Sequence, residues 1–192
     1  GVDNLRRNLS HFRDQERLFI PVGVNLGKSN FSQLEDVPNE YLSTFKKVYD
    51  VADYVTINVS CPNTVGLSSY QTANSLGLLL DTVCNFNETL NKKVPLLLKL
   101  GPDLNNEEAM ACAEIARDYG LSGLVVTNTT AKRNGLTTTT DYGPGGLSGQ
   151  PLFERSTQLL RCVAKDYHKT LTLIGSGGVM DGAAALAKMN AG

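Results

Sequence analysis

The 192-residue sequence has almost no net charge, because 18 Lys and Arg residues face 19 Asp and Glu residues, for a formal charge of −1. A balanced charge creates no strong field that would attract nucleic acid or an anionic membrane surface. No apolar stretch approaches the roughly 18 residues of a membrane-spanning helix. The 41% of hydrophobic residues is enough for one sizeable core, so the composition predicts a globular domain that binds no nucleic acid.

Cysteine is scarce, with four residues and no C-x-x-C pair. The wide spacing argues against both a disulfide framework and a zinc site. Cys84, Cys112 and Cys162 fall in helical patterns, which predicts reduced and mostly buried thiols. Cys61 differs, because it follows an apolar run and lies among polar residues.

Histidine is scarcer still, and both His11 and His168 lie in or beside helical patterns. A Ser-His-Asp or Cys-His mechanism needs a histidine at the site of chemistry. Neither residue is placed there, so we expect both on the surface.

Five short apolar runs predict strands, at residues 19–26, 54–59, 94–100, 123–129 and 171–178. The runs are continuous rather than alternating, which is typical of strands buried on both faces. Helical patterns lie between them, at about 39–52, 72–92, 105–119 and 151–167, and another begins near Asp181. At 105–119, Asn105 and Glu108 predict a capping box and Gly120 a stop.

The alternation of strands and helices predicts an α/β fold with a parallel sheet. Residues at successive strand ends lie roughly 30–50 positions apart, which fits a (β/α)8 TIM barrel of about 250 residues. Five units are present, so we expect an incomplete barrel, about strands 3 to 7, as a single partial domain over residues 1–192. A complete doubly wound open sheet is the alternative.

The predicted strand ends carry amides, hydroxyls, amines and glycines, but no carboxylate. In a barrel the chemistry lies at the carboxyl ends of the strands. Such a set suits a polar or anionic ligand rather than a divalent metal, which prefers carboxylates. The residues concerned are Asn25, Lys28, residues 58–64, Lys99, residues 127–130 and residues 176–178.

Lys99 stands within an apolar strand that offers no nearby acidic residue. An ammonium is costly there, which favours a lysine that faces a ligand with negative charge; a lysine that reaches outward to solvent is the alternative.

The "GSGG" stretch at 175–178 opens a turn into a helix, and the loop after strand seven is a frequent phosphate site in barrels. Ser148 and Gly149 lie close to another helix start and are candidates for the same ligand.

Cys61 follows the second apolar run in "INVSCPNTVGL". A thiol has a reference pKa near 8.5, so a modest shift makes it a usable base or nucleophile. A small buried cysteine is the alternative, and the polar surroundings favour the functional interpretation.

Six stretches follow one another along the chain: "GVNLGKSN" (23–30), "INVSCPNTVGL" (57–67), "LLLKLGPDL" (96–104), "GLVVTNTT" (123–130), "GGLSGQPL" (145–152) and "IGSGGVMDG" (174–182). Together and in this order they resemble dihydroorotate dehydrogenase. The resemblance implies an FMN-binding (β/α)8 barrel that oxidises dihydroorotate to orotate in pyrimidine synthesis.

The resemblance implies a role for each residue at the strand ends. Those that match flavin-holding positions are Asn25, Asn58, Lys99 and Thr127. Those that match the phosphate and ribityl cradle are Ser148, Gly149, Gly177 and Gly178. Those that match orotate-binding positions are Asn58, Asn63, Asn128 and Thr129. Cys61 matches the general base.

Most of the motifs resemble the quinone-dependent, membrane-associated class 2 enzymes, which usually have Ser where this chain has Cys61. The soluble class 1 enzymes have Cys there, so a fumarate- or NAD-linked enzyme is the alternative, and the other motifs favour quinone. Two further alternatives are another FMN barrel that reduces pyrimidines and a truncated, non-catalytic barrel that acts as a binding module.

The family's first two strands, eighth strand and quinone-tunnel helices have no counterpart here. We therefore expect an interior piece of a longer protein, with weak or no activity alone and with membrane association through segments absent from this chain. Class 2 membership implies the mitochondrial inner membrane, with the bacterial inner membrane or the cytosol as alternatives.

Overall fold

The computed structural model describes residues 1–15, 20–60, 73–136, 143 and 145–192. Five parallel strands form one sheet in chain order: β1 (Gly23–Leu26), β2 (Tyr54–Asn58), β3 (Leu96–Leu100), β4 (Gly123–Val126) and β5 (Thr172–Gly175). The helices are α1 (Val2–Gln15), α2 (Val37–Val48), α3 (Ala73–Glu88), α4 (Asn106–Asp118), the short η2 (Gln150–Leu152), α5 (Phe153–Tyr167) and α6 (Gly182–Ala191).

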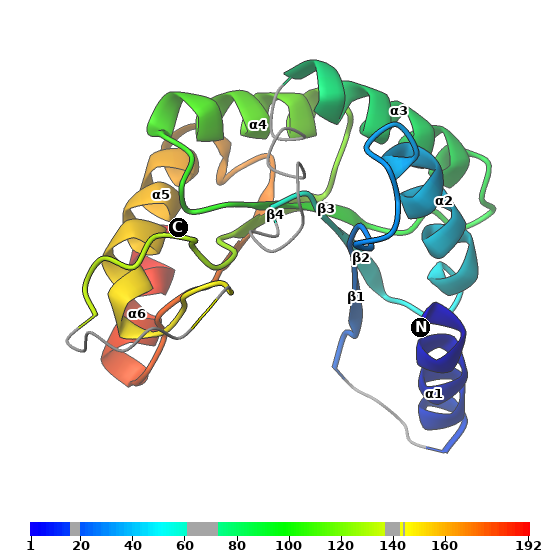
Figure 1. Ribbon diagram of the computed structural model, residues 1–192, viewed down its shortest axis with the longest axis horizontal. Helices are drawn as coiled ribbons and strands as arrows, with labels where there is room; N and C mark the ends of the chain where they lie inside the picture. The colour runs from blue at the N-terminus through cyan, green and yellow to red at the C-terminus, as the bar shows by residue number, and fades with distance from the viewer. Residues whose placement is uncertain (16–19, 61–72, 137–142, 144) are drawn as a thin grey trace.

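The helices α2 to α5 arch over one side of the sheet, each packed against the next (Figure 1). A doubly wound sheet would reverse its strand order and carry helices on both faces. The sequential order β1-β2-β3-β4-β5 therefore identifies part of a (β/α)8 barrel and confirms the first of the two predicted architectures.

The core lies between the helices and one face of the sheet. Along β3, Leu96, Leu98 and Leu100 are buried in this core, and β4 adds Leu124 and Val126. Because side chains alternate across a strand, Leu97, Lys99 and Val125 belong to the opposite face. The helices thus cover one face, and the other face carries Lys99 beside the buried apolar side chains of Leu97 and Val125.

Burial on both faces was predicted for every strand, and this is wrong for two of them. β1 alternates between exposed and buried residues, and β5 has three exposed residues of four. These are the two edge strands of the sheet, so each has a neighbouring strand on one side only. β2, β3 and β4 keep the predicted burial over their central residues.

Helix α1 was not among the predicted helical ranges, because its sequence is polar on average. Val2 and Leu9 pack it against the core, and polar contacts add to this packing. Arg6 forms a hydrogen-bonded ion pair with the carboxylate of Asp50. Arg13 donates to the Val51 carbonyl and to the Asp53 carboxylate, both at 2.7 Å. The strands and the helices α2 and α3 are also shorter than predicted. In the strands, the apolar run of the sequence extends beyond the residues that form hydrogen bonds to a neighbouring strand.

The predicted capping box of α4 is present. The Asn105 side chain accepts from the Glu108 N–H at 2.9 Å, and the Glu108 carboxylate accepts from the Asn105 N–H at 2.7 Å. Both orphan donors at this helix start are thereby satisfied.

Asn87, near the end of α3, is a buried polar residue that holds the entry to β3. Its amide donates to the Val94 carbonyl and accepts from the Val94 N–H, both at 3.0 Å.

Asn87→Ala leaves both backbone groups without a partner, so we expect it to lower the free energy of unfolding by about 2–4 kcal/mol. Urea denaturation measures this loss. The exposed Asn91→Ala is the control, and we expect a change below about 0.5 kcal/mol. Equal effects in both variants would contradict this role.

Candidate functional site

The parallel register places the predicted strand-end residues in rows across the polar face of the sheet. Asn25 of β1 is paired with Thr56 of β2, and Asn58 is paired with Lys99 of β3. Lys99 is in turn paired with Val125 of β4. Because Leu98 and Leu100 lie in the helix-facing core, Lys99 belongs to the same face as Asn58, and it is only partly exposed.

A hydrogen-bond network joins the ends of β2 and β4. The Asn58 Oδ1 atom accepts from the Asn128 Nδ2 atom at 3.1 Å, and from the Ser60 hydroxyl and N–H at 3.1 and 3.3 Å. Asn128 also donates to the Ser60 hydroxyl at 3.1 Å. Two residues that are 70 positions apart in the chain are therefore held together by their amide side chains.

The backbone of Asn58 is fixed from the helix layer. The Tyr41 hydroxyl of α2 donates to the Asn58 carbonyl at 2.7 Å, and Tyr41 is 1% exposed. The buried core and the polar end of β2 thus meet at one residue.

A cis peptide bond joins Val126 to Thr127 at the end of β4. The Thr127 N–H donates to the Ser176 carbonyl at 3.1 Å, and the Ser176 N–H donates to the Val126 carbonyl at 2.7 Å. The Asn128 Oδ1 atom accepts from the Thr129 N–H at 2.8 Å. Both oxygen and nitrogen of this amide are therefore oriented.

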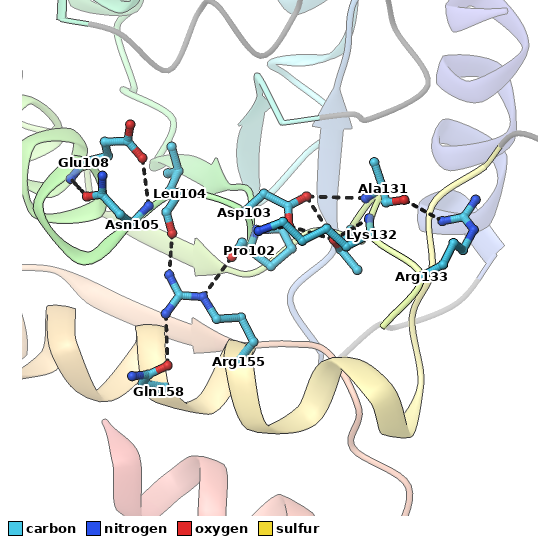
Figure 2. Close-up of polar contacts among 11 residues, drawn as sticks. Pro102, Asp103, Leu104, Asn105, Glu108, Ala131, Lys132, Arg133, Arg155 and Gln158 are labelled. Atoms are coloured by element: carbon cyan, nitrogen blue, oxygen red, sulfur yellow. Dashed lines mark hydrogen bonds and ion pairs between the residues drawn. The ribbon is translucent and has the colours of Figure 1, made fainter. Parts of the chain in front are cut away.

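Asp103 braces the same loop from the end of β3 (Figure 2). Its carboxylate accepts from the Thr130 hydroxyl at 2.7 and 2.9 Å and from the Ala131 N–H at 3.3 Å. Arg155 of α5 ties the β3 loop to the helix layer, because it donates to the Pro102 carbonyl at 3.0 Å and to the Leu104 carbonyl. The loop that follows Thr129 is thus held by Asp103, and Asp103's own loop is held by Arg155.

Two glycine-rich turns meet at the other end of the site. Gly177 and Gly178 have φ values of 101° and 76°, and Gly149 has a φ of 77°. A Cβ atom on Gly178 would lie 2.6 Å from the Cα atom of Phe153, the first residue of α5. Only glycine fits such a close approach with a positive φ. The turn after β5 therefore packs directly on the segment that follows Ser148 and Gly149.

Sequence reasoning missed Ser60, Tyr41, Asp103, Ser156 and Lys188. Ser60 was visible as a polar residue at the same strand end as Asn58 and was given no role. The other four come from helices or from a neighbouring loop, and no spacing rule places them beside the site.

Lys188 of α6 is a buried ammonium, 5% exposed, beside the Gly177–Gly178 turn. Burial lowers its pKa from 10.5 to about 8. Burial acts in the opposite direction on the Cys84 and Cys112 thiols, whose pKa values it raises to about 11, with help from nearby carboxylates. Those two thiols are therefore protonated at neutral pH, as expected for cysteines without a chemical role.

Cys61 and Asn63 lie outside the described residues. His11 and His168 are exposed and distant from the strand ends in sequence, as predicted. Of the described residues, no helix is long and apolar enough to cross a membrane.

The sheet order defines part of a barrel of the (β/α)8 type, with a cluster of polar side chains at the carboxyl ends of its strands. A family model described as dihydroorotate dehydrogenase matches residues 1–192. The chain belongs to the dihydroorotate dehydrogenase family.

Similar proteins agree with this assignment. The dihydroorotate dehydrogenase (quinone) of Acinetobacter baumannii strain AYE is 40% identical over 200 residues, which cover 100% of this chain and 58% of that protein. The enzyme of the same name from Synechococcus sp. strain JA-3-3Ab is 42% identical over 199 residues, which cover 100% and 51%. A crystal structure of DHODH with ferulenol from Eimeria tenella matches with a TM-score of 0.87 and 31% identity, over 100% of this chain and 57% of that one. The chain spans about half the length of the curated relatives it matches. The predicted resemblance to the quinone-dependent class is thereby confirmed.

Lys188 makes stability depend on pH. Its pKa is about 8 in the folded chain and near 10.5 when unfolded, so between these values the unfolded state binds more protons. The contribution of Lys188 to the free energy of unfolding therefore rises with pH across this window. Below pH 8 the buried lysine is charged, and its burial then destabilises the folded state by the full amount. We expect the stability of the unsubstituted chain to increase relative to Lys188→Met from pH 8 to pH 10 in urea denaturation. A constant difference would contradict the lowered pKa.

Proposed function

We propose that the protein containing this chain oxidises dihydroorotate to orotate with FMN as its cofactor and a quinone as its electron acceptor. The observation that carries the proposal is the network of Asn58, Ser60 and Asn128. The network lies on the polar face of a partial barrel, and its member Ser60 directly precedes Cys61 in the sequence. The family to which the chain belongs supports the same activity.

The described residues fit FMN. Among them, the backbone N–H groups of Ser148, Gly149, Gly177 and Gly178 donate no hydrogen bond. Free N–H groups on glycine turns at helix starts suit a phosphate. Asn25, Asn58, Lys99 and Thr127 would hold the ring system. FMN supplies a two-electron acceptor for the hydride of the substrate.

A cation beside the flavin has an electrostatic role in this proposal. Negative charge grows on a flavin ring as it is reduced, and a preorganised ammonium stabilises that charge. Lys99 is placed for this, since the register pairs it with Asn58 and it lies on the polar face. Leu97 of the same strand and Val125, the residue paired with Lys99 on β4, belong to the same face and are buried.

Asn58, Asn63, Asn128 and Thr129 are the proposed ligands of the substrate. The dihydroorotate ring presents alternating N–H and C=O groups and one carboxylate, and carboxamides offer both a donor and an acceptor to such an edge. The hydrogen bonds that orient Asn58 and Asn128 in the described chain fix which atom of each amide faces its neighbours. A site built in this way discriminates against rings that lack the matching groups.

Cys61 is the proposed general base. As a thiolate it accepts the proton from C5 of dihydroorotate, while the hydride leaves C6, so that a C5=C6 double bond remains in orotate. Most class 2 enzymes have a serine at this position. A thiol is more acidic than a serine hydroxyl, so it loses its proton more readily near neutral pH and can serve as the base.

The acceptor proposal favours quinone, because the curated relatives at 40% and 42% identity are quinone enzymes. Cys61 supports the second candidate, a class 1 enzyme that uses fumarate or NAD. Association with an inner membrane, mitochondrial or bacterial, belongs to the quinone proposal.

The catalytic role of Cys61 is tested by anaerobic reduction of bound flavin in a protein that contains the whole sequence. We expect Cys61→Ala to slow bleaching by dihydroorotate about 10²- to 10⁴-fold, because it removes the base. Cys84→Ala is the control, since its protonated thiol lies on α3 and has no proposed role. Stopped-flow absorbance measures both rates. Equal rates for Cys61→Ala and the unsubstituted protein would refute the role of this residue, and absence of bleaching in all of them would refute the activity.

The acceptor is tested by reoxidation of the reduced flavin. We expect a ubiquinone analogue to reoxidise it at least about tenfold faster than fumarate or NAD, a difference of about 1.4 kcal/mol in barrier. The rates are measured by the recovery of flavin absorbance after mixing. Faster reoxidation by fumarate would assign the chain to the second candidate.

A further inference from the structure

A buried ammonium lies beneath the glycine turn that follows β5. The Lys188 Nζ atom donates to the Ser156 hydroxyl at 2.5 Å and approaches the Ser176 carbonyl at 3.4 Å. The ring of Phe153 lies 5.6 Å from the same nitrogen. Among the described residues no carboxylate pairs with Lys188, and its exposed fraction is only 5%. A buried charge without a counter-ion is costly, so its retention calls for a reason.

Lys188 and Ser156 fix the direction of two successive peptide units. The Ser176 carbonyl points to Lys188 and to the Thr127 N–H, and the Gly177 carbonyl accepts from the Ser156 hydroxyl at 2.9 Å. In a planar trans peptide the C=O and the following N–H point in opposite directions. The N–H groups of Gly177 and Gly178 are therefore turned away from Lys188 and Ser156.

These two N–H groups have no hydrogen-bond partner in the part of the chain that the structure describes. Both glycines have positive φ, and Gly178 is buried against Phe153. Unsatisfied buried N–H groups are rare in native proteins unless a ligand completes them. Successive N–H groups of this kind form an anion-binding concavity.

We propose that Lys188, together with Ser156, is a positioning residue for the phosphate of the flavin. It holds the Ser176 and Gly177 carbonyls on one side of the turn, so that the Gly177 and Gly178 N–H groups face the phosphate on the other. The inference rests on the proposed function, because that supplies the phosphate-bearing ligand.

The lowered pKa of Lys188 agrees with this placement. Burial alone accounts for the shift in the described chain. A phosphate on the far side of the turn would supply the missing negative charge and return the pKa toward its ordinary value.

The test compares FMN with riboflavin, which has the same ring but no phosphate. Apoprotein that contains the whole sequence is titrated with each flavin, and binding is followed by quenching of flavin fluorescence. We expect Lys188→Met to weaken FMN binding about 10- to 100-fold and riboflavin binding less than about threefold, because only FMN contacts the turn through a charged group. Lys188→Arg should recover most of the loss.

Two further variants complete the experiment. Ser156→Ala should give a smaller loss with the same preference for FMN, and its combination with Lys188→Met should be less than additive, since both act through one turn. Lys165→Met, an exposed lysine of α5, is the control and should change neither affinity. Ser156→Ala also keeps the test available if Lys188→Met does not fold.

An equal loss of FMN and riboflavin in these variants would assign Lys188 a purely structural role and overturn the inference. Unchanged FMN binding would overturn it as well. Binding of neither flavin by the unsubstituted protein would instead overturn the proposed function, and the inference with it. The two failures are therefore distinguishable.

Discussion

The side-chain oxygen of Asn58 accepts three hydrogen bonds, and the geometry of the site depends on them. They join the end of β2 to the end of β4 across β3, so that two amides and one hydroxyl occupy fixed positions on the polar face. The Tyr41 hydroxyl fixes the backbone of the same residue from the core. Asn128 also donates to the Ser60 hydroxyl, so the three side chains form one closed network in which each orients the others.

The two faces of the sheet have different roles because alternate side chains of a strand lie on opposite faces. Leu96, Leu98 and Leu100 alternate with Leu97 and Lys99, so one strand contributes both to the core and to the site. The helices cover one face only (Figure 1). Substitutions in the core and substitutions at the site can therefore have separate effects on stability and on chemistry. Asp103 and Lys188 are exceptions, because each lies outside the strands and holds a turn that carries site residues.

The repeating strands, the helices between them and the residues at the strand ends were predictable from the sequence, because a buried parallel strand gives a continuous apolar run. Lys99 stood out for the same reason, as a charge within such a run. The place of helix α1 was not predictable, since its ion pairs join residues about 40 positions apart and its Val2 and Leu9 pack against a core built from later elements. Lys188 could not be found either, because an alanine-rich helix with one lysine is typical of a solvent-exposed segment and only the packing of α6 on α5 buries it.

The direct test of the central claim is a crystal structure of a protein that contains the whole sequence, grown with FMN and orotate. The account predicts that the orotate ring lies within hydrogen-bond distance of the Asn58 and Asn128 side chains, with the flavin phosphate on the N–H groups of Gly177 and Gly178. Flavin and orotate bound elsewhere, with the network of Asn58, Ser60 and Asn128 facing only solvent, would contradict it.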